Sequence, residues 1–320
     1  MARTASTVRR WFMFNDGPQH RQLRRIIAPL FSAGSISGVR PYIEDLVDAL
    51  LDNRHDQIDI MADVAVPLSS QVICHMLGLS PEVAPHLEGW SQDIAALLIA
   101  DYLPQVVRQG DEALQNITQA VDAAMRDNAL SEESGLGLLR QAHADGLISS
   151  SDITATSSLL VYAGFETTST FIGKAVRAAL HAGKWRELTH AGIETTVEEL
   201  LRFDTSVQQV ARVASAPIEV AGHRIDAGDL VLLMLGVANR DPNHFSAADT
   251  LDSHRGPKRH LAFGHGSHYC LGAGLARLEA QIVLRKMMTK WGHIELAESP
   301  KTRSHYGVPV LEHIRVSVHL

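Results

Sequence analysis

The feature that most constrains this chain is a glycine-rich loop around one cysteine, which reads FGHGSHYCLG over residues 263–272. Glycines before and after Cys270 allow backbone conformations and close approaches that a side chain would block. The loop is therefore suited to lie against a flat group. Apolar residues then recur at helical spacing from Leu271 until Gly292, so we expect Cys270 to lie at the N-terminus of a helix.

This position predicts a chemical role for the sulfur. Backbone N–H groups and the helix dipole at a helix N-terminus favour a thiolate over a thiol. A thiolate that donates to haem iron is the arrangement associated with cleavage of the O–O bond. A buried structural cysteine is the alternative, because free cysteines are among the most buried residues. Cys74 fits that alternative, since it lies in the apolar run VICHML without a glycine loop.

A long segment upstream predicts a helix that begins near Asp152, its expected N-cap, and runs to about His181. At ~1.5 Å per residue it would be on the order of 45 Å long. Its middle reads AGFETT over residues 163–168. Gly164 and the threonines are expected to loosen and bend the helix. A solvated glutamate beside two threonines that bond to the preceding turn is the alternative for this motif.

A third motif, ELLR, places Glu199 and Arg202 three residues apart. On a helix this spacing puts the carboxylate and the guanidinium on one face, where they can pair. An exposed pair of this kind would contribute only ~0.2–0.5 kcal/mol, whereas deletion of one member of a buried pair would cost roughly 3–5 kcal/mol.

These three motifs, in this order, resemble those of the cytochromes P-450, the haem-thiolate monooxygenases. Residues 263–272 are similar to the family's haem-binding signature F-x-x-G-x-[R/H]-x-C-x-G, and residues 163–168 to its acid–alcohol pair. The resemblance covers most of residues 10–320. It implies a mainly α fold with minor β, in which haem lies between a long central helix and the cysteine-loop helix, and we expect one catalytic domain over residues 1–320.

The resemblance also implies roles for individual residues. Cys270 would be the iron ligand, Thr167 would hydrogen-bond iron-bound oxygen species, and Glu166 would help to deliver protons. Glu199 and Arg202 would form a buried structural ion pair that joins a third group. The other residues expected to contact haem b are His20, Arg24, Ala163, Arg212, His260, Phe263, Gly264, His268 and Gly272. Of these, His20, Arg24, Arg212 and His268 resemble ligands of the haem propionates, with His260 as a further candidate.

The implied reaction is reductive activation of dioxygen, with electrons from NAD(P)H that arrive through a ferredoxin and its reductase. The substrate would be hydroxylated or oxidatively coupled in bacterial secondary metabolism. Cross-linking of a peptide and action on a carrier-bound substrate are two versions of this function. A catalytically silent P-450-like activator or scaffold for a partner enzyme is the alternative. Such a protein would need neither the thiolate nor the acid–alcohol pair.

The net charge of −7 argues against nucleic acid as a partner, because phosphate binding depends on clustered Lys and Arg. A local basic face for an acidic ferredoxin is still expected, with solvated helix faces as the alternative. Its predicted members are Arg21, Arg24, Arg25, Arg277 and Lys286. Two cysteines far apart predict a reducing compartment. The apolar run after Arg9 and Arg10 is too short for an export signal, so we expect a cytoplasmic protein without a membrane partner.

The beginning of the chain departs from the family's pattern. In the family a substantial part precedes the helix that His20 and Arg24 resemble, whereas here that helix comes almost at once. We therefore expect a reduced or absent N-terminal portion and an open distal side. A large substrate would then complete the wall, and Trp11, Phe12 and Phe14 would cover part of the haem. A truncated start is the alternative.

Overall fold

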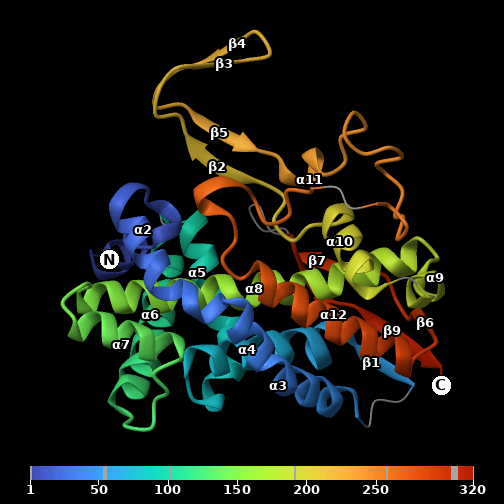
Figure 1. Ribbon diagram of the computed structural model, residues 1–320, viewed down its shortest axis with the longest axis horizontal. Coiled ribbons are helices and arrows are strands. Elements are labelled where there is room, and N and C mark those ends of the chain that lie inside the picture. Colours follow the sequence, from blue (N-terminus) through green and yellow to red (C-terminus); the bar gives the residue numbers. More distant parts are fainter. Residues whose placement is uncertain are drawn as a thin grey trace.

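The computed structural model describes residues 2–52, 56–100, 102–190, 192–256, 259–303 and 309–319. Most of them are helical, and the strands form small antiparallel sheets (Figure 1). The helices are α1 (Ala2–Arg9), α2 (Gly17–Ile27), α3 (Ala33–Leu51), α4 (Val66–Leu77), α5 (Leu87–Ile99), α6 (Pro104–Arg126), α7 (Gly135–Ala144), α8 (Ser150–His181), α9 (Trp185–His190), α10 (Ile193–Phe203), α11 (Leu235–Ala238) and α12 (Ala273–Lys290). The expected fold class, mainly α with minor β, is confirmed.

The strands are β1 (Gln57–Asp59), β2 (Val210–Val213), β3 (Ile218–Val220), β4 (His223–Ile225), β5 (Leu230–Leu233), β6 (His293–Leu296), β7 (Lys301–Arg303), β8 (Val310–His313) and β9 (Arg315–His319). The order β1-β9-β6 forms a three-stranded sheet beside the helices. The pairs β2–β5 and β3–β4 form a ribbon that projects from the helical body (Figure 1). The ribbon carries Arg212, which lies opposite Val231 in the β2–β5 register.

The long helix α8 runs through the middle of the molecule (Figure 1). Its N-cap is Ser149, whose side chain accepts a hydrogen bond from the Asp152 N–H, while the Asp152 carboxylate accepts from the Ser149 N–H. The prediction of Asp152 as the N-cap was therefore wrong by three residues, because a capping box uses an acidic side chain at its third helical position.

Gly164 has a packing role that the sequence pattern did not reveal. The helix is continuous from Ser150 to His181, and a Cβ added at Gly164 would lie 2.7 Å from the side chain of Ile73 in α4. Glycine therefore allows α4 and α8 to approach each other closely at the level of the AGFETT motif.

Trp11 anchors the N-terminal segment to α8. Its side chain is fully buried, its Nε1 donates to Ser158 Oγ at 3.0 Å, and its ring stacks on Tyr162 with centroids 5.3 Å apart. Phe12 is also buried, whereas Phe14 is 53% exposed. Trp11 is thus committed to the protein core, and the expectation that it covers the haem is not supported by its contacts.

One helical stretch of the described residues, Ile60–Leu77, is long and apolar enough to cross a membrane, with a mean hydropathy of 1.4. It includes α4 and the π-helical turn η3 (Ile60–Ala65) that precedes it. Because 67% of the stretch is buried inside the protein, packing in the core accounts for its apolar character.

Candidate active site

The cysteine loop is closed by its own backbone. The Cys270 N–H donates to the Phe263 carbonyl at 2.9 Å, and the Gly264 N–H donates to the Leu261 carbonyl at 2.9 Å. Gly264 and Gly266 have φ values of 71° and 73°, a region that favours glycine. A Cβ added at either glycine would meet no atom within 4 Å. The loop therefore needs these glycines for their backbone conformation, and it has an open side.

The Cys270 side chain lies on this open side and is exposed to solvent, although protein atoms are dense around its other sides. That partial burial raises the pKa of the thiol, while the Gly272 N–H and the positive charges of Arg24 and Arg277 act in the opposite direction. The expected stabilisation of a thiolate at the start of α12 is thus present but outweighed by desolvation. Coordination to a metal would supply the missing positive charge.

Two histidines expected to contact the cofactor lie side by side. The ring centroids of His20 and His268 are 4.3 Å apart, and His268 Nε2 is 2.8 Å from Asp16 Oδ1. His20 is 3% exposed, and its buried Nε2 has no hydrogen-bond partner among the described residues. Burial lowers the pKa of His20, and the charges of His268 and Arg24 lower it further. A buried ring nitrogen without a partner is a position for a polar ligand group.

The two arginines of the predicted set lie near this histidine pair. Arg24 is on α2, one turn after His20, and its Nη2 donates to the Tyr269 carbonyl next to Cys270 at 2.8 Å. Arg212 is exposed on β2. The hydrogen bond from His268 is the main cause that lowers the pKa of Asp16, and the charge of Arg212 makes the smallest contribution. The structure therefore brings His20, Arg24, Arg212 and His268 to one edge of the cysteine loop.

His260 lies in a different network, with its ring centroid 6.2 Å from that of Phe263. Its Nε2 is 3.2 Å from Glu198 Oε2, and its Nδ1 accepts the Ala262 N–H at 3.2 Å. Both ring nitrogens are thus used inside the protein, which is at odds with the expected contact to a propionate. Arg277 completes this network, since its Nε and Nη2 donate to the Glu198 carboxylate at 2.6 and 3.0 Å.

The network of His260, Glu198 and Arg277 contacts the cysteine loop through Arg277. The Arg277 guanidinium lies 4.4 Å from the centroid of the Phe263 ring, and its Nη1 is 3.4 Å from the Tyr269 hydroxyl. Partial burial raises the pKa of Glu198, but hydrogen bonds from His260 and Arg277 outweigh it and bring the pKa to about 2. This carboxylate therefore stays charged and holds two side chains that contact the loop.

The acid–alcohol motif presents its residues on two sides of α8. Ala163 is exposed and Thr167 is half-buried, and the Thr167 hydroxyl donates to the Ala163 carbonyl at 3.0 Å. Glu166 is 7% exposed, and Ser91 Oγ of α5 donates to its Oε2 at 3.4 Å. The bond from Thr167 fits the alternative of a back-bonding threonine. Glu166, by contrast, is buried and held, which excludes the solvated glutamate of that alternative.

Glu199 and Arg202 of α10 form the expected buried pair. Arg202 Nε and Nη2 donate to the two carboxylate oxygens of Glu199 at 2.7 and 2.8 Å, and both side chains are at most 4% exposed. Arg255 is the third group, with Nε 3.1 Å from Glu199 Oε2. Arg202 also donates to the carbonyls of Asn239 and Ala248. The pair thereby ties α10 to the irregular segment that leads to the cysteine loop.

Comparison with known proteins gives one consistent result. The sequence model named Cytochrome P450 matches residues 193–308. A biotin biosynthesis cytochrome P450 of Bacillus subtilis (strain 168) is 31% identical over 312 residues, which cover 95% of this chain and 79% of that relative. The 20-oxo-5-O-mycaminosyltylactone 23-monooxygenase of Streptomyces fradiae is 35% identical, over 86% of this chain and 66% of its own length.

The fold agrees with the sequence. The solved structure of P450BioI in complex with hexadec-9Z-enoic acid ligated acyl carrier protein has a TM-score of 0.90 and 30% identity, and the match covers 99% of this chain and 84% of that one. This chain belongs to the cytochrome P450 family. The resemblance to this family is thereby confirmed.

Membership in the cytochrome P450 family implies a haem group, and the residues present fit one. Haem needs an axial ligand for its iron, a flat apolar surface and donors for two anionic propionates. This P450 offers the solvent-open sulfur of Cys270 on an open glycine loop. It also offers the buried Nε2 of His20, without a partner among the described residues, beside the charged edge that Arg24, Arg212 and His268 form.

The basic face expected for a redox partner is smaller in this P450 than the sequence suggests. Arg277 forms an ion pair with Glu198, and Lys286 forms one with Asp48. Arg24 donates a hydrogen bond to the cysteine loop. Arg21 and Arg25 remain exposed on α2. Arg277 and Lys286 are already paired with acidic residues of α10 and α3, so the docking face stays a prediction that rests first on Arg21 and Arg25.

Sequence reasoning missed the residues that support the loop from elsewhere in the chain. These include Arg255, which completes the Glu199 pair, Glu198, which joins His260 to Arg277, and Asn239, whose Oδ1 accepts the Leu261 N–H at 2.6 Å. The adjacency of Glu198 and Glu199 in α10 was the one available signal, since two acidic residues on a helix present carboxylates in two directions.

Proposed function

We propose that this cytochrome P450 is a haem-thiolate monooxygenase that hydroxylates or oxidatively couples an organic substrate of bacterial secondary metabolism. The observation that carries the proposal is the solvent-open Cys270 on a glycine loop, with the unpartnered buried Nε2 of His20 at its edge. One group is suited to hold iron and the other to hold an anionic substituent of the same cofactor. We assign the iron ligand to Cys270 and the propionate contacts to His20, Arg24, Arg212 and His268.

When bound, haem supplies the binding and reductive activation of dioxygen. The chain's own residues then donate protons and limit the access of water. The Thr167 hydroxyl, on the exposed side of α8, can release its bond to the Ala163 carbonyl and donate to a ligand in the distal space. Glu166, one position earlier and buried, can exchange a proton with its surroundings without opening the site to bulk water.

The substrate and the redox partner are the finer parts of the proposal. The similar protein P450BioI has been solved in complex with a fatty-acid-loaded acyl carrier protein. This supports a carrier-bound acyl substrate as the first candidate, with peptide cross-linking as the second. We propose that electrons derived from NAD(P)H arrive singly from a ferredoxin supplied by its reductase. The exposed Arg21 and Arg25 on α2 support docking of an acidic partner.

The absorption spectrum of the reduced protein with carbon monoxide tests the proposal. We expect the red-shifted thiolate band in the wild-type protein and in Cys74→Ser, since Cys74 is buried in the core at 1% exposure. The band should be lost in Cys270→Ser, because a serine hydroxyl does not donate as a thiolate does. A band that survives in Cys270→Ser would contradict the assignment. Bound haem without the band in the wild-type protein would favour the silent scaffold.

The substrate class can be tested by the shift of haem iron from low to high spin. The oxidised protein would be titrated with acyl-loaded carrier protein, with the same free fatty acid and with candidate peptides. A shift at much lower concentration for the carrier-bound acyl group than for the free acid is expected. An equal response to the free acid and the loaded carrier would contradict recognition of the carrier.

A further inference from the structure

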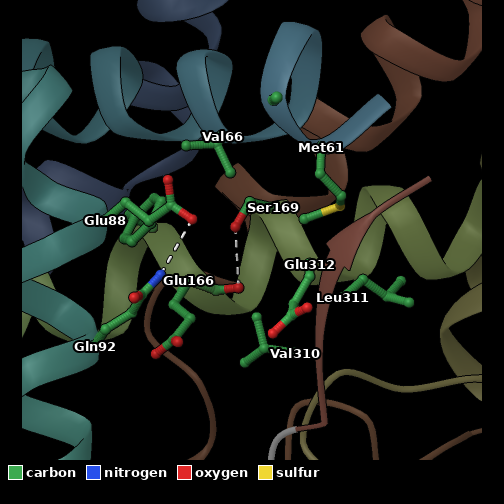
Figure 2. A pocket seen from close by; sticks show the side chains of 11 residues that line it. Met61, Val66, Glu88, Gln92, Glu166, Ser169, Val310, Leu311 and Glu312 are labelled. Carbon is green, nitrogen blue, oxygen red and sulfur yellow. Dashed lines mark hydrogen bonds between the residues drawn. The ribbon is translucent and has the colours of Figure 1, made fainter. Parts of the chain in front are cut away.

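A cavity of about 60 Å³ lies beside Glu166 on the side of α8 formed by Phe165, Glu166 and Ser169. Its other walls come from α5, from η3 and the start of α4, and from β8 near the C-terminal end of the chain (Figure 2). The cavity thus brings together segments that are far apart in the sequence. Ala163 and Thr167 do not line it, so it is separate from the exposed side of the acid–alcohol motif.

Three carboxylates from three elements line this cavity: Glu88 of α5, Glu166 of α8 and Glu312 of β8 (Figure 2). Glu88 is exposed and accepts a hydrogen bond from Gln92 Nε2 at 3.1 Å. The Glu312 side chain is 31% exposed and lies 2.9 Å from Lys301 Nζ. Glu166 is 7% exposed and is the innermost of the three. The acidic residues that line the cavity therefore range from exposed to buried.

The cavity has the size and the polarity to hold water. A buried water needs roughly 10–15 Å³ of space for its centre and two to four polar partners. The observed volume of about 60 Å³ is several times larger. The partners available on its walls are the three carboxylates, the Gln92 amide and the Ser169 hydroxyl. Apolar side chains such as Met61 and Val66 form the rest of the wall.

We propose that this cavity is the route by which protons reach Glu166, with Glu88 and Glu312 as its entry carboxylates. The inference rests on the proposed function, since a monooxygenase turnover consumes two protons and two electrons with each dioxygen and releases one water. Only O–H bonds are exchanged along the route. Glu166 gives its proton towards the Thr167 side and takes one from cavity water, and the entry carboxylates restore that proton from bulk solvent.

The entry carboxylates act at a distance from the reaction and are relay residues. The exposed Glu88 places negative charge at the mouth, which raises the local concentration of hydronium. The two oxygens of each carboxylate can accept one proton and pass on another. Gln92 donates to Glu88 and Ser91 donates to Glu166, and these bonds keep the two carboxylates oriented. Removal of the entry carboxylates should therefore slow delivery of protons without disturbing the haem side.

The test compares variants at the mouth of the cavity in the haem-loaded protein. Glu88→Gln, Glu312→Gln and the double variant remove the carboxylates, and Ala62→Phe fills the cavity from η3 without removal of a charge. Glu132→Gln is the matched control, because Glu132 is exposed and lies outside the cavity wall. Two quantities are measured: the fraction of supplied electrons that end in product rather than hydrogen peroxide, and the solvent deuterium isotope effect on product formation.

We expect the double variant and Ala62→Phe to lower the product fraction several-fold and to increase the isotope effect. Glu88→Asp should restore most of the product fraction, since it keeps a carboxylate in place, and Glu132→Gln should match the wild type. A crystal structure of the haem-loaded protein with ordered water between Glu88, Glu166 and Glu312 would support the route. A dry cavity, or unchanged values in the double variant and in Ala62→Phe, would overturn it.

The carbon monoxide spectrum separates this inference from the proposed function. The thiolate band should be present in the wild type and in all cavity variants, because none of the substitutions touches the cysteine loop. Loss of the band from the wild type would overturn the proposed function and the inference together. A normal band in every variant with an unchanged product fraction would overturn the proton route alone.

Discussion

At the scale of single residues, this P450 uses neighbouring positions of one helix for different purposes. In α8, Thr167 is half-buried and bonds the Ala163 carbonyl, while Thr168 is 5% exposed and belongs to the packed interior. In α10, Glu198 faces the cysteine loop through Arg277, while Glu199 faces the buried Arg202. Adjacent side chains on a helix point about 100° apart, so one residue can serve the site and its neighbour the core.

Substitution Thr167→Ala should impair use of electrons without loss of stability. Within the part of the chain that the structure describes, the hydroxyl bonds to a carbonyl of its own helix alone, and its removal leaves the backbone intact. We expect the product formed per electron to fall several-fold, with peroxide released instead, because a proton donor on the distal side is lost. Thr167→Ser should retain most of the product yield.

The adjacent variant Thr168→Ala is the control for Thr167→Ala. It removes a buried side chain and should act mainly on thermal stability. The amounts of peroxide and of product per electron are measured for both variants. An equal loss of product to peroxide in the two variants would contradict a special role of Thr167.

The lowered pKa of Glu198 predicts that the free energy of unfolding depends on pH. Its pKa falls from 4.5 to about 2 on folding, so its contribution to the free energy of unfolding is complete above pH 4.5 and disappears as the pH falls towards about 2. Because the side chain is 42% exposed, solvent screens the interaction, and we expect a contribution on the order of 1 kcal/mol. Urea unfolding of Glu198→Gln and wild type at several pH values measures it.

The difference between Glu198→Gln and the wild type should be present at neutral pH and shrink on acidification. Glu194→Gln serves as the control, since Glu194 lies on the same helix in an exposed pair with Arg285. A difference for Glu198→Gln that does not change between pH 7 and pH 3 would contradict the assignment.

At the scale of elements, α10 is the member that organises the approach to the cysteine loop. Its Arg202 donates to carbonyls of residues 239, 248 and 250 as well as to Glu199. These carbonyls belong to irregular chain, which has no ladder of its own to satisfy them. One buried guanidinium with five donors therefore replaces the hydrogen bonds that a sheet or a helix would have supplied.

Arg202→Ala should destabilise the protein by roughly 3–5 kcal/mol, because it leaves the Glu199 carboxylate partly unpaired in the interior. Arg202→Lys should recover only part of this loss, since an ammonium lacks the planar fork. The midpoint and slope of urea unfolding and the retention of haem measure the effect. Arg285→Ala, which breaks an exposed pair between Arg285 of α12 and Glu194 of α10, should cost at most about 1 kcal/mol. Equal losses for Arg202→Ala and Arg285→Ala would contradict the structural role.

At the scale of the whole molecule, apolar side chains remain exposed on the segments that carry the expected cofactor contacts. Leu232 and Leu233 of β5 are 44% and 43% exposed. Leu261, just before the cysteine loop, and Tyr269 within it are 37% and 41% exposed. The first two lie on the strand that pairs with the strand of Arg212. A flat apolar cofactor against these segments would therefore add to the core of the protein as well as to its chemistry.

Removal of haem should lower the thermal midpoint by several degrees. A ligand present at 100 times its dissociation constant stabilises the folded state by about 2.7 kcal/mol, and the apolar surface it covers becomes exposed when it leaves. Thermal unfolding of haem-loaded and haem-free protein at one pH measures the shift, and the binding of a dye that fluoresces on apolar surface should rise. Equal midpoints and equal dye binding would contradict a haem that packs on these segments.

The sequence by itself was sufficient for the local parts of this protein. Helical spacing predicted the central helix to within a few residues of its observed ends, Ser150 and His181. The glycines of residues 263–272 predicted a loop with an open side, and the E-x-x-R spacing predicted the pair that Glu199 and Arg202 form. Each of these features depends on residues within about four positions of one another. A short stretch of sequence is therefore enough to predict it.

Only the tertiary structure decided which distant groups meet. In the folded protein Arg277 pairs with Glu198, and both ring nitrogens of His260 form hydrogen bonds. The Nε2 of His20 is buried without a partner in the described chain. It also placed Glu88 and Glu312 around Glu166. The reason is that pairing, burial and cavities depend on how elements pack that are separated by tens to hundreds of residues. A sequence pattern shows which side chains share one face of an element. It does not show which other element will pack against that face.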